Sequence, residues 1–284
     1  MGDFRGHSLV GSAFLLYGLM WSIRYPMVYL RGAAHGRHWH RMDLVEGIFK
    51  FIFASIGAVM ENFAPSIGPR FHLINPEDHS WVGLSGWLHT TMYIFFSLSG
   101  LVDILTYSPL KIPQGLDRLT LALAFSLEGL LMYNHVRSQQ PLEGLLHAFV
   151  LVVACIGFFC LVAEIFMRGH IILELFRSIL AILQGSWLWQ IALAVHPLRG
   201  APWDQKDRSN LEFVPICFSW HLAMAIIIVI TNYSLVHCYV MKYKKSSATN
   251  KIEFQKLGSA PEELEIRLLE ESDEEYPGRT NRQL

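Results

Sequence analysis

The sequence predicts an all-α membrane protein, a bundle of seven transmembrane helices. Hydrophobic residues make up 52% of the 284-residue chain and charged residues only 17%, a balance typical of polytopic membrane proteins. The apolar residues also gather into seven stretches, and each can form a helix of the roughly 20 residues that cross a bilayer. Apart from His147, runs such as 145–162 and 222–230 are apolar on every side, which favours helices over the short alternating segments of a β-barrel.

The seven predicted spans follow one another along a single bundle over residues 1–243. Their expected bounds are 8–30, 43–63, 82–107, 116–136, 142–167, 170–196 and 211–241. No basic segment leads the first span, so we expect it to stay as an anchor and not to be cleaved as a signal peptide. All four cysteines lie inside these stretches, and no loop disulfide is expected.

Basic residues between the spans predict the orientation, because short loops rich in Lys and Arg stay in the cytosol. One set of alternate loops, together with the end of the last span, holds Arg31, Arg37, Arg41, Lys111, Arg118, Lys242, Lys244 and Lys245. The opposite loops hold fewer basic residues, and two of them also carry acids. We therefore expect the amino terminus outside the cell or in the lumen and the carboxyl terminus in the cytosol.

Residues 244–284 are polar and acidic, which predicts a disordered cytosolic tail. Ser272 precedes three acidic residues, a pattern that suits an acidophilic kinase or an acidic sorting signal, although a solvated tail has the same composition. The net charge is −1, and the basic residues are confined to short membrane-flanking clusters. The expected partners are thus the lipid bilayer and cytosolic sorting or kinase proteins, and no nucleic acid.

Histidines and glutamates lie within the spans, where a bilayer tolerates few ionisable groups. With a rise of about 1.5 Å per residue, the predicted orientation places most of them in the outer half of the bundle. This group comprises His89, Glu128, His135, His147 and His221, with Glu61 and His7 at its rim. Glu128 and His135 are seven residues apart, nearly two turns, and share one helix face.

Imidazole and carboxylate are ligands that Zn²⁺ and related divalent metals prefer. The sequence therefore suggests a metal site made by His89, His135, His147, His221 and Glu128. Water on such an ion ionises near neutral pH and attacks an ester or amide, with Glu128 or Glu61 as general base. This is the chemistry of a metal-dependent intramembrane hydrolase with a lipid or acyl substrate. The competing interpretation is that each histidine only makes hydrogen bonds between packed helices.

A second polar set lies in the predicted inner half. Glu46 and Lys50 are four residues apart, and Glu174 and Arg177 three apart, spacings that favour ion pairs within a helix. Gln184 continues the stripe of Glu174 and Arg177. The same stripe could form a polar path through the bundle, as in a transporter or proton relay.

Two further function classes stay open: a transporter that uses this stripe, and a non-enzymatic adaptor in trafficking or signalling that works through its acidic tail.

A receptor of the G-protein-coupled type has the same number of spans. However, the third span ends in Leu-Val-Asp-Ile-Leu-Thr-Tyr and not in Asp-Arg-Tyr, and the last span contains Thr-Asn-Tyr-Ser-Leu and not Asn-Pro-x-x-Tyr.

Several segments carry a resemblance to a known family. They are Phe4-Arg-Gly-His-Ser-Leu, Gly86-Trp-Leu-His-Thr-Thr-Met-Tyr-Ile-Phe-Phe, Ser99-Gly-Leu-Val-Asp-Ile-Leu, Glu128-Gly-Leu-Leu-Met-Tyr-Asn-His135, Leu173-Glu-Leu-Phe-Arg-Ser, Leu183-Gln-Gly-Ser-Trp-Leu-Trp-Gln-Ile and Cys217-Phe-Ser-Trp-His221. With these segments the chain resembles the transmembrane protein 45 family, which shares the domain of unknown function 716, without separating its A and B types. The resemblance implies a multi-pass protein of the endomembrane system (Golgi or endosome) or of the plasma membrane. It brings no accepted catalytic residues.

Overall fold

A computed structural model describes residues 4–32, 36–63 and 73–274 of the chain, without the side chains of 36–41 and 246–274. The described residues form seven helices: α1 (Phe4–Arg31), α2 (Gly36–Asn62), α3 (Leu84–Leu105), α4 (Leu116–Ser138), α5 (Pro141–Phe166), α6 (Ile171–Val195) and α7 (Arg208–Glu274). The predicted all-α class is confirmed.

Five of the helices are long and apolar enough to cross a membrane. They are α3 to α6 and the part of α7 from Arg208 to Lys245, and they coincide with the last five predicted spans. The chain is therefore a multi-pass membrane protein. Helices α1 and α2 form where the first two spans were predicted, but α2 carries Asp43, Glu46, Lys50 and Glu61, and neither helix is among these five. Their crossing of the bilayer stays a prediction.

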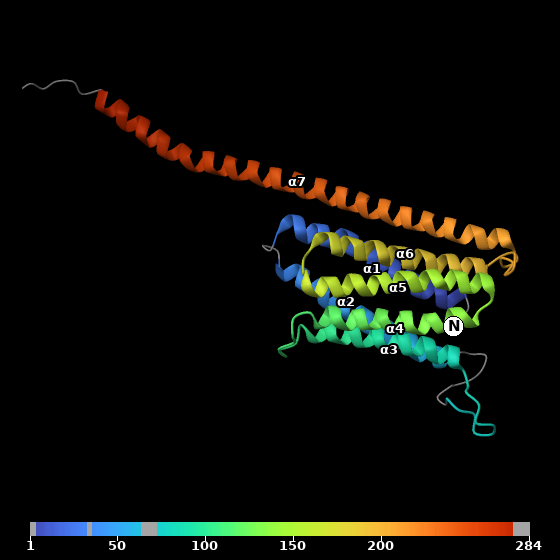
Figure 1. Cartoon of the computed structure of the whole chain (residues 1–284). Helices are drawn as coiled ribbons and strands as arrows, with labels where there is room; N and C mark the ends of the chain where they lie inside the picture. The colour runs from blue at the N-terminus through green and yellow to red at the C-terminus, as the bar shows by residue number, and fades with distance from the viewer. Residues whose placement is uncertain (1–3, 33–35, 64–72, 275–284) are drawn as a thin grey trace, which may run out of the picture. The chain divides into compact units, whose positions relative to one another are not determined.

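The first six helices pack as neighbouring pairs. Figure 1 shows α1 alongside α6, α2 alongside α3 and α4 alongside α5, and further contacts join α3 to α4 and α5 to α6. Residues 1–236 make up one compact unit, which includes the first part of α7, and residues 237–284 make up another. The expected domain boundary at residue 243 and the disorder of 244–284 stay predictions, because the side chains of most of this segment lie outside the described residues.

Glycines let α1 and α6 approach each other closely. A Cβ atom on Gly185 of α6 would lie 2.6 Å from the carbonyl oxygen of Gly11 and 2.6 Å from the backbone nitrogen of Leu15, both on α1. Real Cβ atoms do not come this close to backbone atoms, so only glycine fits. Small residues at such crossings are the usual means by which membrane helices pack.

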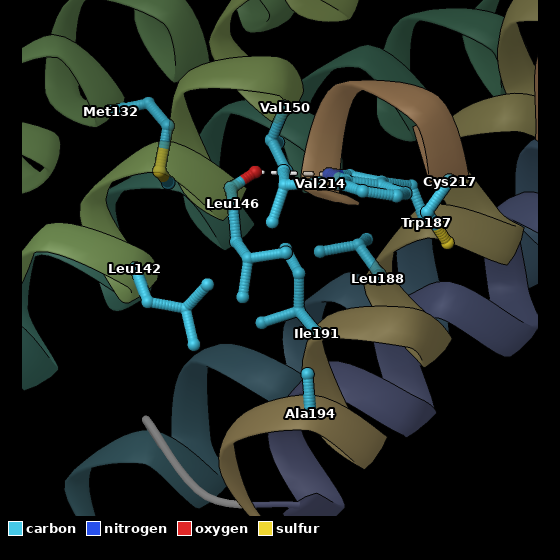
Figure 2. Packing of buried hydrophobic residues seen from close by; sticks show 10 residues of the cluster. All are labelled: Met132, Leu142, Leu146, Val150, Trp187, Leu188, Ile191, Ala194, Val214 and Cys217. Carbon is cyan, nitrogen blue, oxygen red and sulfur yellow. Dashed lines mark hydrogen bonds between the residues drawn. The ribbon is translucent and has the colours of Figure 1, made fainter. Parts of the chain in front are cut away.

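The main hydrophobic cluster surrounds Trp187 of α6, whose side chain is fully buried. Figure 2 shows its ten residues, which come from α4, α5, α6 and α7: Met132, Leu142, Leu146, Val150, Trp187, Leu188, Ile191, Ala194, Val214 and Cys217. The indole Nε1 donates a 2.9 Å hydrogen bond to the carbonyl oxygen of Leu146, so the polar atom of the buried ring has a partner. The cluster fixes α6 against α5, next to the cavity described below.

Candidate functional site

A cavity of about 150 Å³ lies among the first six helices of the bundle. Its wall on α1 extends from Gly6 to Trp21, or about 22 Å at 1.5 Å per residue, so the cavity is long and narrow. Most of its wall is apolar or aromatic, and its acidic and basic side chains are His7, Lys50, Glu61, His89, Glu128 and His147. Narrow apolar cavities with a few polar groups are the usual form of small-molecule sites.

Three phenylalanines from three helices form an aromatic cluster in the cavity wall. Phe14 of α1, Phe96 of α3 and Phe125 of α4 all line the cavity. Their ring centroids are 5.5–6.1 Å apart, in edge-on geometry, as aromatic pairs prefer. Phe125 is three residues before Glu128 on α4, and residues three apart lie on one helix face. The aromatic cluster therefore lies close to a carboxyl group.

Glu128 is buried in this wall with only 6% of its surface exposed. Its Oε1 accepts a 2.6 Å hydrogen bond from Nε2 of Gln184 on α6. Its Oε2 is also buried and has no hydrogen-bond partner among the described residues. An unpaired buried oxygen costs free energy unless another group binds it.

Histidines from several helices form a row at one end of the cavity. Nε2 of His7 on α1 lies 3.1 Å from Nε2 of His147 on α5. The ring of His147 is 4.9 Å from that of His135 on α4, which is 6.1 Å from that of His89 on α3. Nδ1 of His89 lies 3.2 Å from Oε1 of Glu61 on α2. We call these four histidines and Glu61 the histidine row.

The tautomer of His147 follows from its second contact. Its Nδ1 lies 2.8 Å from the carbonyl oxygen of Glu143, and a carbonyl only accepts, so Nδ1 carries the proton. In the neutral imidazole Nε2 then has a free lone pair, and it accepts from His7. A backbone carbonyl on the far nitrogen is also the usual way in which a metal-binding histidine is oriented.

The structure thus brings together part of the predicted metal set. His89, His135 and His147 lie in the histidine row, and Glu128 lines the same cavity. His221 lies apart from the row, where its Nδ1 contacts Oγ of Ser186 at 3.0 Å. Among the described side chains, no three His, Cys, Asp or Glu groups converge as a ready metal site. The metal and the general-base roles of Glu61 and Glu128 stay predictions.

His7 and His196 are more central than their sequence positions suggested. His7 was placed at the rim of the predicted group, yet it contacts His147 directly, and its ring is 6.3 Å from that of His196, at the C-cap of α6. His196 was not among the predicted site residues. Its position at the outer end of the sixth predicted span was the available signal.

Charged groups at the other end of the helices form ion pairs between helices. Nε of Arg177 donates to Oε1 of Glu164 at 2.8 Å and its Nη2 donates to the hydroxyl of Tyr25 at 2.7 Å. The other oxygen of Glu164 accepts from Nε of Arg118 at 2.9 Å, and the Arg177 guanidinium lies 4.3 Å from the centre of the Trp21 ring. Four helices are joined at this point.

The predicted pairs within helices were wrong about the partners. Arg177 pairs with Glu164 of α5 rather than with Glu174. Lys50 pairs with Asp103 of α3 at 2.6 Å, and Glu46 pairs with Arg24 of α1 at 2.9 Å. These long side chains reach across helix interfaces because an unpaired charge there costs more than one facing water.

Glu174, Arg177 and Gln184 have separate surroundings. Glu174 lines a second, polar cavity of about 390 Å³, Arg177 is enclosed by its partners, and Gln184 binds Glu128. The carboxylates of the second cavity are Asp43, Glu46, Asp103, Asp117, Glu164 and Glu174. Tyr107, just after α3, also lines it, and burial raises the pKa of its hydroxyl to about 12. That hydroxyl is therefore neutral at physiological pH.

Comparison with known proteins gives a family of unknown function. The family model described as "Family of unknown function (DUF716)" matches residues 114–234, which include α4, α5, α6 and the start of α7. Transmembrane epididymal protein 1 of Homo sapiens is 33% identical over 140 residues, 48% of this chain and 50% of that protein.

Two rodent relatives match a longer part of the chain. Transmembrane epididymal protein 1 of Rattus norvegicus is 28% identical over 240 residues, and transmembrane epididymal protein 1A of Mus musculus is 26% identical over 247 residues; each match covers 78% of this chain and 77% of the relative. The narrower likeness to the transmembrane protein 45 family stays a prediction. The chain is thus a multi-pass membrane protein with homology to transmembrane epididymal protein 1 and a DUF716 match over its central helices.

Proposed function

We propose that this membrane protein binds a small, mostly apolar molecule in the cavity among α1 to α6. The observation that carries the proposal is the cavity itself, an apolar space of about 150 Å³ whose wall also holds polar groups. A ligand in this space makes van der Waals contacts with the apolar wall and covers apolar surface, and both effects favour occupation.

The size of the cavity limits the ligand. An engineered protein cavity of about 150 Å³ lined by aliphatic and aromatic side chains holds benzene, so a single ring with a short chain suits this one. Such molecules dissolve in the bilayer, and the helices around the cavity include membrane spans. The bilayer is therefore the expected source of the ligand.

Binding of 2-phenylethanol to the purified full-length chain in lipid nanodiscs tests the proposal. We expect a saturable rise in melting temperature at one ligand per chain. Ala54, which is 3% exposed and lines the cavity, is replaced by Leu to fill the space, and Ala223→Leu places the same bulk on an exposed position of α7. The rise should vanish in Ala54→Leu and persist in Ala223→Leu. Equal responses of both variants would reject the cavity as the site.

We also propose that α1 and α2 cross the membrane, which gives seven spans with an outer or lumenal amino terminus and a cytosolic carboxyl terminus. Their outward faces are apolar, with Leu16 60%, Val45 64% and Ile56 57% exposed. Arg24 and Lys50, in contrast, are buried and paired, so these two charges avoid lipid. A tag before residue 4 should be accessible only from the outer or lumenal side, and cytosolic access would contradict this topology.

The compartment and the tail partners are separate proposals. Residence in the Golgi or endosome and recognition of Ser272 by a kinase or sorting protein rest on the sequence alone. Deletion of 246–284 tests the adaptor function: the truncated protein should leave its compartment while 2-phenylethanol binding is unchanged. Normal location of the truncated protein would contradict it.

A second candidate function, a metal-dependent hydrolase, is supported by the contact between His7 and His147. Two imidazole nitrogens bound to one tetrahedral Zn²⁺ at about 2.05 Å would be roughly 3.3 Å apart, and these two lie 3.1 Å apart. His135 is the nearest further ligand in the row, and Glu61 would be the general base of the row. Elemental analysis should give one divalent metal per chain, lost in His147→Ala and retained in His221→Ala. A metal content that is zero or unaffected by His147→Ala would reject this candidate.

A further inference from the structure

We propose that the ligand of the cavity carries a protonated amine, which Glu128 binds through its unpaired oxygen. This inference rests on the proposed function, since it names the chemical class of the molecule that the cavity takes.

Glu128 differs from the other buried glutamates in its partners. Three glutamates are buried in the described part of the chain. Glu61 lies against the imidazole of His89, and Glu164 lies between Arg177 and Arg118. Glu128 has one neutral partner, Gln184, and its Oε2 has no hydrogen-bond partner within the described residues. Buried carboxylates are normally paired with a cation, so a cation is the missing group.

The aromatic rings next to Glu128 favour a cationic ligand over an anionic one. Phe14, Phe96 and Phe125 line the same cavity, and Phe125 is one turn before Glu128 on α4. The face of an aromatic ring is electronegative and attracts ammonium groups within about 6 Å. A carboxylate with aromatic rings beside it therefore binds an ammonium group through both kinds of contact.

The other charges that line the cavity already have partners. Lys50 is paired with Asp103 at 2.6 Å. His147, which donates through Nδ1 and accepts through Nε2, is neutral in this arrangement. The carboxyl group of Glu128 thus determines the sign of the ligand's charge, and a phosphate or carboxylate placed there would be repelled.

Two probes of nearly equal shape, 2-phenylethylamine and 2-phenylethanol, test the inference. Both are titrated into the full-length protein in nanodiscs at pH 7, where the amine is protonated. A hydrogen bond to a charged group contributes more than a neutral one, so the wild type should bind the amine about 10- to 100-fold more tightly than the alcohol. Glu128→Gln, which keeps an oxygen for Gln184, should lose this preference and bind the alcohol with little change. Glu212→Gln, the same change at an exposed glutamate of α7, should keep the preference.

Each outcome separates the inference from the proposed function. If the alcohol binds and the amine has no advantage in the wild type, the amine class is wrong while the cavity remains a binding site. If Glu128→Gln keeps the preference, Glu128 does not hold the amine. If neither probe binds, the proposed function fails as well. Should Glu128→Gln not fold, Phe125→Leu replaces it and should weaken the amine more than the alcohol; an equal loss for both would overturn the inference.

Discussion

Replacement of Glu164 by glutamine removes one charge from a buried group of ion pairs that joins α4, α5 and α6. Its two oxygens accept from Arg177 at 2.8 Å and from Arg118 at 2.9 Å, and the residue is 4% exposed. Glutamine has nearly the same shape but is neutral, so two guanidinium groups would share a buried space without their carboxylate. Removing one partner of a buried pair costs about 3–5 kcal/mol. Because the amide oxygen can still accept one hydrogen bond, we expect about 3 kcal/mol, or roughly 150-fold in the unfolding equilibrium.

The free energy of unfolding can be measured by titration with sodium dodecyl sulfate in mixed micelles, followed by tryptophan fluorescence. Glu212→Gln is the control, because Glu212 is 65% exposed and its pair with Arg208 is on the surface, where such pairs contribute about 0–1 kcal/mol. A loss in Glu164→Gln no larger than in Glu212→Gln would refute the argument that this ion pair holds the helices together.

Two further predictions concern packing and use the same unfolding measurement. Gly185→Ala should destabilise the protein by about 1–3 kcal/mol through overpacking, because its new Cβ would meet the backbone of Gly11. The control Gly129→Ala should change the stability little, because a Cβ there has only ordinary contacts. Equal effects of the two variants would contradict the close approach of α1 and α6. Trp187→Phe should lower the free energy of unfolding by about 1–3 kcal/mol, because a hydrogen bond and buried volume are lost. The control Trp220→Phe, at a 58% exposed position, should leave the stability nearly unchanged. A Trp187→Phe variant as stable as the wild type would be inconsistent with the cluster in Figure 2.

The helices were predictable because a membrane span is a local property of the sequence. Length and apolarity alone predict α3 to α6 and the start of α7. The charged residues within α1 and α2, Arg24 and Lys50 among them, lower the apolarity of both helices, and this property does not depend on which way a side chain points. The structure turns both cations inward onto carboxylates of neighbouring helices, and only tertiary contacts reveal this.

The sequence predicted in which half of the bundle the candidate residues lie, but not which neighbours their side chains face. Counting residues from the predicted membrane boundaries places His89, His135 and His147 in the same half of the bundle, and the structure has them in one row. His221 was predicted in the same half but contacts Ser186 instead, because the position of a residue along a helix does not give the rotation of the helix or its neighbours. For the same reason, sequence spacing did not reveal that Gln184 of α6 contacts Glu128 of α4.

The most direct test of ligand binding in the cavity is to map where a photoreactive ligand attaches. A diazirine derivative of 2-phenylethanol, irradiated with the full-length protein in nanodiscs, should label residues of the cavity wall such as Phe14, Met92 and Phe125. Excess 2-phenylethanol should remove this labelling. Labelling confined to exposed positions such as Leu16 and Leu130, unchanged by the competitor, would contradict the proposal that the cavity is a binding site.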